Sequence, residues 1–198
     1  LLGINYFNYS NPIDNNNDNF TDLTLQDRIS VFQKWQFDRK DNRLFSLAAR
    51  YFYEDRWGGE MQWNKSHRGT DQVYGESIYT RRMELLGNYQ LPFNEKIFLT
   101  FSFTDHDQNS VYGQTQFLAR QKIGFLQANW NKTIGKHNLL LGTSMRYNNY
   151  NDNTPATTTT DEKTIPSIYV QDEIKLHPNH QILLGARLDN HQNHGNIF

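Results

Sequence analysis

The stretch Lys96-Ile97-Phe98-Leu99-Thr100-Phe101-Ser102-Phe103-Thr104 decides the fold class of this chain. Apolar residues at positions 97, 99, 101 and 103 alternate with polar residues at 96, 100, 102 and 104, and only Phe98 departs from the pattern. A period of two is the repeat of a β-strand, whose successive side chains point to opposite faces of the sheet. The stretch is therefore predicted to be a strand with one apolar and one polar face.

The same alternation recurs along the chain, for example at Ile182, Leu184, Ala186 and Leu188. Asp172 interrupts the apolar face of one such segment, and no segment carries a sustained apolar stripe of helical period. The pattern predicts an all-β protein. About nine strands are expected, near residues 1–9, 25–38, 43–55, 76–90, 95–105, 117–133, 138–149, 166–176 and 182–192.

The connections between these strands are of two kinds. Short polar turns are expected at residues 39–43, 91–95, 134–138 and 177–181. Long loops are expected between them, at roughly residues 10–24, 56–75, 106–116 and 150–165. Short turns on one side and long loops on the other are typical of outer-membrane β-barrels, in which the short turns face the periplasm. The sequence therefore predicts a sheet with two unlike ends.

The length of the strands points to a membrane. Several run to about 13 residues, which at ~3.3 Å per residue and a tilt of ~40° rise about 33 Å, enough to cover an apolar band of ~25 Å. The mean hydropathy is −0.82, and the apolar runs are too short for a membrane helix. Strands need apolar residues only at alternate positions, so we expect an antiparallel transmembrane β-barrel, with the polar alternates facing its lumen: Lys96, Thr100, Ser102, Arg187 and Asp189.

Nine strands are too few for the whole barrel. An open sheet would leave unpaired N–H and C=O groups facing lipid, at a cost of several kcal/mol for each group. The sequence begins in a strand-like segment at Leu1, without an initiator Met, and stops at Phe198 without a terminus signal. We therefore expect residues 1–198 to be an interior piece of a longer barrel.

The first long loop contains a candidate calcium site. Oxygen-bearing side chains at Asp14, Asn16, Asp18 and Asp22 follow the DxDxDGxxD spacing in which a tight turn gathers carboxylates around Ca²⁺. Asn19 takes the place of the usual Gly and is the next-best residue for a left-handed turn. An Asn-rich surface loop without a metal is the alternative interpretation.

The second long loop is a candidate surface for ligand contact. It combines two tryptophans, a Gly-Gly pair and charges of both signs, and exposed aromatic and Arg side chains commonly anchor ligands. The alternative is a loop that packs on its own aromatics at the rim of the barrel. The predicted substrate-binding residues are Arg56, Trp57, Glu60, Trp63 and Arg68.

Composition and motifs argue against several other functions. The net charge is −1 and no basic block stands out, so nucleic-acid binding is not expected. The chain has no cysteine, which excludes disulfides and thiolate metal sites. The acidic pair Asp172 and Glu173 lies on opposite faces of one strand and cannot act together as acid and base. No catalytic constellation is present, and an enzyme is not expected.

Several segments resemble the barrel portion of TonB-dependent outer-membrane receptors, of the sort found in Bacteroidetes. The likeness covers nearly the whole chain, and the order of the segments adds weight to each of them. The segments are Tyr53-Glu54-Asp55-Arg56-Trp57-Gly58-Gly59-Glu60-Met61, Tyr74 to Arg82, Asp152 to Thr157, Tyr169-Val170-Gln171-Asp172-Glu173, Gly185 to Asp189 and His194 to Phe198.

The resemblance implies a 22-stranded barrel filled by an N-terminal plug domain that this sequence does not contain. Receptors of this kind import scarce nutrients such as iron–siderophore chelates, haem, cobalamin or glycans. The inner-membrane proton gradient powers them through TonB, ExbB and ExbD. The resemblance also fits the calcium interpretation, because some cobalamin transporters order their outer loops with calcium.

The predicted function is TonB-dependent transport of a small-molecule nutrient, with cobalamin or a metal chelate preferred, across the bacterial outer membrane. Outer-membrane lipids, the TonB–ExbB–ExbD complex and a surface lipoprotein are the expected partners. Two other classes stay open. A passive porin would share the strands but lack a plug upstream, and a soluble β-sandwich binding module would fold without detergent.

Overall fold

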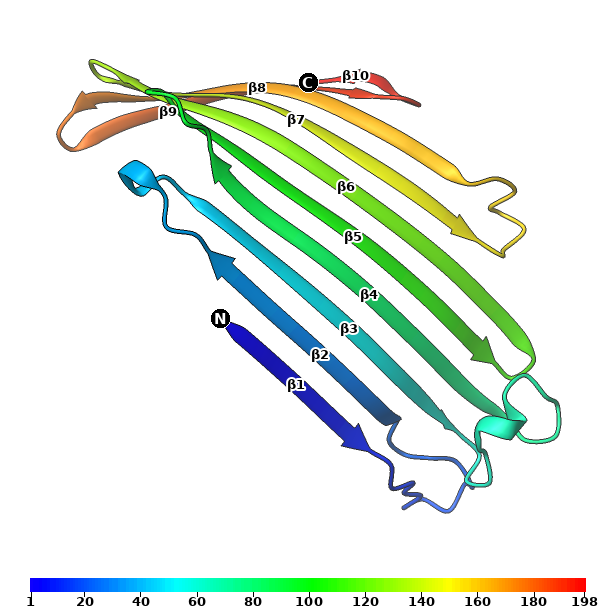
Figure 1. The fold of residues 1–198 in the computed structure, drawn as a ribbon. Helices are drawn as coiled ribbons and strands as arrows, with labels where there is room; N and C mark the ends of the chain where they lie inside the picture. Colours follow the sequence, from blue (N-terminus) through cyan, green and yellow to red (C-terminus); the bar gives the residue numbers. More distant parts are fainter.

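In the computed structural model, which describes residues 1–198, the chain forms one antiparallel sheet of ten strands in the order β1 to β10 (Figure 1). Each strand pairs only with its neighbours in sequence. The strands are β1 (Leu2–Tyr9), β2 (Leu25–Gln36), β3 (Phe45–Gly59), β4 (Gly75–Gln90), β5 (Lys96–Tyr112), β6 (Thr115–Ile134), β7 (His137–Asp152), β8 (Asp161–His177), β9 (His180–His191) and β10 (Gly195–Ile197).

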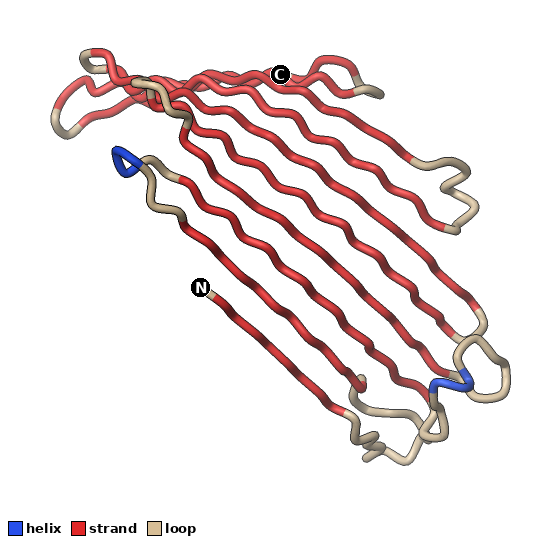
Figure 2. The backbone as a smooth tube through the Cα atoms, in the orientation of Figure 1, coloured by secondary structure: helices blue, strands red, loops and turns tan.

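The rest of the chain consists of turns, loops and two 3₁₀ turns of three residues, η1 (Lys40–Asn42) and η2 (Lys65–His67). Neither of these short turns could span a membrane as a helix. The backbone trace in Figure 2 shows a single curved layer, in which β1 and β10 form the two edges and the sheet does not close on itself. The all-β prediction is confirmed, with β10 added to the nine strands expected.

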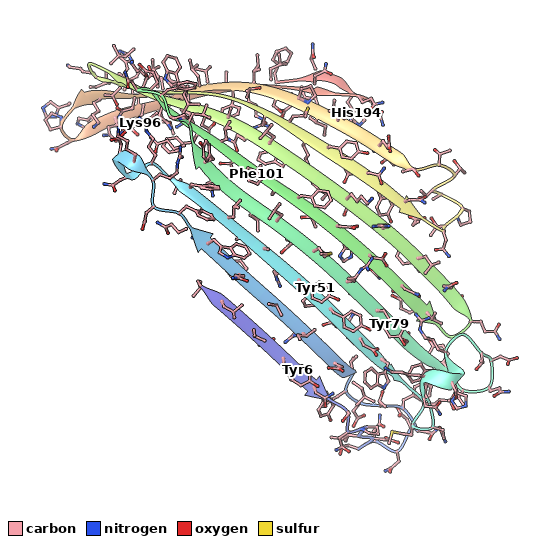
Figure 3. The ribbon with its side chains drawn as sticks, in the orientation of Figure 1. Tyr6, Tyr51, Tyr79, Lys96, Phe101 and His194 are labelled. Atoms are coloured by element: carbon pink, nitrogen blue, oxygen red, sulfur yellow. The ribbon has the colours of Figure 1, made fainter.

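Strand register places the apolar residues on one face. Residues directly opposite one another on successive strands form a row that crosses the sheet from β2 to β8. Its members are Trp35, Leu47, Gly87, Phe101, Leu126, Met145 and Pro166. Tyr51, Tyr79 and Phe101, labelled in Figure 3, all belong to this apolar face. The predicted apolar alternates of the segment Lys96 to Thr104 therefore share a face with those of its neighbours.

The adjacent row, on the opposite face, is polar at every position. Its members are Gln36, Ser46, Asn88, Thr100, Gln127, Ser144, Ser167 and Asp189. All five side chains predicted to face the lumen belong to this polar face, since Ser102, Lys96 and Arg187 occupy neighbouring rows of the same parity.

The sheet has almost no buried core. Only 10 of its 198 residues are buried, whereas apolar side chains such as Ile168 and Met83 are 59% and 54% exposed. A layer that presents an apolar face of this kind needs an apolar medium or a second layer to cover it. The apolar face of a barrel wall meets lipid in this way.

The connections also divide as predicted, with one correction. Residues 37–44, 91–95, 135–136 and 178–179 join strands at one end of the sheet, here called the turn end (Figure 1). The opposite end, the loop end, carries residues 10–24, 60–74 and 153–160. The prediction of a long loop at 106–116 is wrong. Strand β5 continues to Tyr112 and β6 begins at Thr115, so only Gly113 and Gln114 connect them. Gly113 has a φ of 58°, the left-handed conformation that such a tight turn requires.

Candidate functional site

The loop between β1 and β2 folds on its own polar side chains. Asn17 and Asn19 both have left-handed backbone conformations, with φ of 60° and 68°. The Asp14 carboxylate accepts hydrogen bonds from the amides of Asp18 and Asn19, at 3.3 and 2.9 Å. The Asp22 carboxylate accepts from both the backbone and the side-chain nitrogens of Asn15, at 2.8 and 2.7 Å. Asn19 thus supplies the left-handed turn predicted for it.

The oxygen donors of the predicted calcium site are used within the loop. Asp18 accepts from the side-chain amide of Asn16 and from the backbone of Phe20, at 2.9 and 2.8 Å. No group of three or more acidic or histidine side chains is placed to hold a metal ion. The donor chemistry suits Ca²⁺, and binding of the ion by Asp14, Asn16, Asp18 and Asp22 stays a prediction.

The same loop is tied to the end of β3. Thr21 donates its backbone N–H to the Gly59 carbonyl at 2.8 Å, and Phe20 forms an isolated antiparallel bridge with Glu60. The side-chain amides of Asn19 and Gln62 exchange two hydrogen bonds of 3.1 Å. Backbone and side-chain bonds therefore join the first two loops of the loop end into one unit.

Two cationic side chains hold the second loop against the apolar side of the strand ends. Arg68 donates to the Ser77 hydroxyl at 3.1 Å and to the backbone and side-chain oxygens of Asn109 at 3.0 and 2.8 Å. Its guanidinium also lies 4.6 Å from the centroid of the Tyr79 ring. Lys65 donates to Asp55 at 2.6 Å, and this hydrogen bond is the main reason that the pKa of Lys65 is raised.

A cavity of about 310 Å³ lies where the two loops meet the sheet. Its strand residues Arg56, Gly58, Glu76 and Ile78 lie on the polar face. The loop residues Phe20 and Tyr74, whose ring centroids are 6.3 Å apart, also line it. The remaining lining residues are Thr21, Thr24, Trp57 and Gly59. We call this cavity the rim pocket.

The predicted substrate-binding residues occupy different places around this pocket. Arg56 and Trp57 line it, and Glu60 accepts a hydrogen bond from the backbone of Tyr74 at 2.9 Å, beside it. Trp63 packs on Gly75, where an added Cβ would lie 2.2 Å from the indole Cδ1 atom. Arg68 is occupied by Ser77 and Asn109. The five residues therefore do not form one cluster, and contact of any of them with a substrate stays a prediction.

Sequence reasoning missed part of the pocket. Phe20 and Tyr74 were not predicted, although both are aromatic residues at the ends of the two loops that were singled out. Ser77 and Asn109, the partners of Arg68, carry no sequence signal of their own. Their proximity depends on the register of β4 with β5, in which Ser77 and Asn109 lie two residues apart across the strand pair.

The middle of the polar face carries a second polar cluster. The Tyr169 hydroxyl bonds to the side chains of Gln127 and Asn129, two strands away. Arg187 donates to Ser167 at 3.0 Å and pairs with Asp189 at 2.8 Å. Ser167, Arg187 and Asp189 line a cavity of about 430 Å³ together with Arg146, which has no polar partner in the structure. The polar face is thus suited to contact polar groups inside a barrel.

The comparison with protein families agrees with this geometry. The family described as TonB dependent receptor-like, beta-barrel, matches residues 1–198. Searches of curated proteins and of solved structures give no match. Barrels of this family lie in the bacterial outer membrane and serve TonB-dependent transport rather than catalysis. They act with TonB and with the substrate that they carry. The chain therefore belongs to the TonB-dependent receptor family, as a portion of its outer-membrane β-barrel.

Proposed function

We propose that this wall takes part in active uptake of a scarce nutrient, such as cobalamin, an iron–siderophore complex, haem or a similar chelate. The rim pocket is the observation that carries the proposal. It lies at the loop end, which faces outside in barrels of this kind, and it opens among residues of the polar face. A cavity with aromatic walls and few charged groups is the usual form of a small-molecule site.

The proposal places the polar face against a plug domain encoded outside residues 1–198, with further strands that complete a 22-stranded barrel. Unpaired backbone groups at the β1 and β10 edges support the need for such strands, because an edge exposed to lipid is costly. In this scheme ExbB and ExbD supply energy through TonB, and a surface lipoprotein assists capture. Origin in Bacteroidetes stays a prediction.

Uptake by the full-length receptor tests this function. Cells that lack the receptor would be supplied with the full-length gene and grown with cobalamin, haem or an iron–siderophore complex as the limiting nutrient. We expect growth on one of these nutrients, and loss of that growth in a matched strain without TonB. Growth that does not depend on TonB would favour a passive channel. Recovery of the native protein in the soluble fraction would favour a β-sandwich binding module.

Calcium binding by Asp14, Asn16, Asp18 and Asp22 is a separate proposal. It requires the loop to exchange its internal hydrogen bonds for oxygen contacts to the ion. Calorimetric titration of the full-length receptor with Ca²⁺ tests it. We expect binding heat that disappears in the Asp14→Ala and Asp18→Ala variants. Equal heat in the native protein and in both variants would reject the site.

A further inference from the structure

The charged side chains at the rim pocket differ in whether they have a hydrogen-bond partner. Tyr74 donates a hydrogen bond to each of the two neighbouring carboxylates. Its backbone N–H donates to Glu60 and its hydroxyl donates to Glu76, each at 2.9 Å. The hydrogen bond to Glu76 is also the main reason that the pKa of Tyr74 is raised. Arg56 lines the same pocket, is exposed and makes no hydrogen bond or ion pair in the structure. The pocket therefore presents one charged group without a partner, and that group is a cation.

The surface behind the pocket has the same sign. Along the strands of the polar face, basic side chains outnumber acidic ones, although the whole chain has a net charge of −1. The basic residues are Arg28, Lys34, Arg50, Arg56, Arg82, Lys96, Arg146, Lys163, Lys175 and Arg187; the acidic residues are Glu54, Glu76, Glu84, Asp152, Asp161, Glu173 and Asp189. A surface with an excess of one sign concentrates ligands of the opposite sign near it.

We propose that the rim pocket binds an anionic group, a carboxylate or a phosphate, attached to an aromatic or apolar body, and that Arg56 is the residue that anchors it. This inference rests on the proposed function and narrows the class of cargo. The planar guanidinium can bind either anion through two parallel hydrogen bonds. Phe20 and Tyr74 supply the aromatic surface for the body of the ligand.

The structure also holds this pocket ready before a ligand arrives. Thr21 and Gly59 bind each other twice, through the Thr21 amide at 2.8 Å and the Thr21 hydroxyl at 3.1 Å. Asn19 and Gln62 tie the loops together above them. A site whose walls are fixed in advance loses less conformational freedom on binding. The loop that carries Phe20 is therefore fixed at the rim pocket before the cargo binds.

Binding of small probes to the full-length receptor in detergent tests the proposal. Phenyl phosphate and benzoate carry the two anionic groups on an aromatic ring, and benzyl alcohol is the neutral counterpart. Calorimetric titration measures the affinity of each probe for the native protein and for each variant. We expect at least one anion to bind, Arg56→Gln to weaken that binding at least tenfold, and Arg56→Lys to weaken it less. Comparison of phenyl phosphate with benzoate shows which of the two anionic groups the pocket binds.

Arg81→Gln is the matched control, because Arg81 lies near the same end of the sheet but on the apolar face. It should leave probe binding unchanged. Phe20→Ala should weaken phenyl phosphate more than inorganic phosphate. Binding of neither anion, equal binding of benzyl alcohol, or unchanged affinity in Arg56→Gln would overturn the inference. TonB-dependent growth of the same strains is scored separately, so loss of anion binding with growth intact rejects only this inference.

Discussion

Tyr169 of β8 lies over Gly142 of β7 so closely that a Cβ atom at position 142 would be 2.1 Å from the ring Cζ. The glycine leaves the space that the ring fills, and the ring places its hydroxyl beside Gln127 and Asn129. One small residue thus determines where the central polar cluster of the sheet forms.

Gly142→Ala should therefore destabilise the barrel. The added methyl group forces Tyr169 away from Gln127 and Asn129, and overpacking of this kind costs about 1–3 kcal/mol. Urea unfolding of the refolded full-length receptor in vesicles measures the change. Gly124→Ala is the matched control, since its nearest neighbour would be 3.8 Å away. Equal stability of the two variants would show that Tyr169 moves without cost.

Arg39 joins the first short turn to β4. Its guanidinium lies 4.1 Å from the centroid of the Tyr89 ring and donates to the Gln90 carbonyl at 2.6 Å and to the Tyr89 hydroxyl at 3.0 Å. We expect Arg39→Ala to lower the unfolding free energy by about 1.5–3 kcal/mol, the range for hydrogen bonds to charged groups. Arg39→Lys should recover only part of this, because an ammonium cannot reach both acceptors in one plane. Full recovery by Lys would contradict this account.

Arg68→Ala should release the loop of residues 60–74. The change leaves the Ser77 hydroxyl, on a residue that is 1% exposed, without its partner, at a cost of about 1–3 kcal/mol. Opening of this loop should become at least roughly tenfold more frequent. Limited proteolysis of the loop measures this opening. Arg81→Ala, which removes an exposed ion pair with Asp107 at 3.5 Å, should leave the cleavage rate unchanged.

The turn of residues 91–95 should make stability depend on pH. The pKa of the Glu95 carboxyl is lowered from its ordinary value of 4.5, first by the hydrogen bond from Lys132 and then by that from Trp130. Because the folded pKa is the lower one, the stabilisation is complete above the unfolded value and is lost as the pH falls through the folded pKa. The denaturant concentration at the unfolding midpoint should therefore be lower at about pH 3 than at about pH 7.

Glu95→Gln supplies the comparison for that pH effect. It keeps a group that can accept from the Trp130 indole, which now donates at 3.0 Å, but removes the charge that titrates. The difference in unfolding midpoint between the two pH values should therefore be smaller in Glu95→Gln than in the native protein. An identical difference in both proteins would assign the pH dependence to other groups.

Sequence patterning predicted the strands best where one face is apolar. In the segment Lys96 to Thr104, alternate residues meet opposite surroundings, so the period of two is visible. Toward the loop end of β5 both faces are polar: Arg81, Asp107 and Arg120 lie opposite one another on what was the apolar face. Backbone pairing continues there although the apolar signal has ended. That is why residues 106–112 were predicted as loop and are strand.

The exception at Asp172 has a similar explanation. It interrupts the apolar alternation of β8, and the structure pairs its carboxylate with the His137 ring nitrogen at 2.6 Å. The two residues are 35 positions apart and meet only through the register of β7 with β8. Register also brings together Ser77 and Asn109, the partners of Arg68, and sets Arg56 opposite Ile78 at the rim pocket. A single sequence contains no direct signal for register, so the strands were predictable and these contacts were not.

The strictly sequential pairing of the strands has a consequence for how such a wall can evolve. Every strand pairs its backbone only with its neighbours in the chain, so a duplicated pair of strands with its turn can be inserted without rethreading any other segment. A pair keeps each later turn and loop at its own end of the sheet. Insertion of a single strand would send every later loop to the opposite side of the membrane. The two-strand hairpin is therefore the unit by which this architecture can be lengthened while the binding loops stay outside.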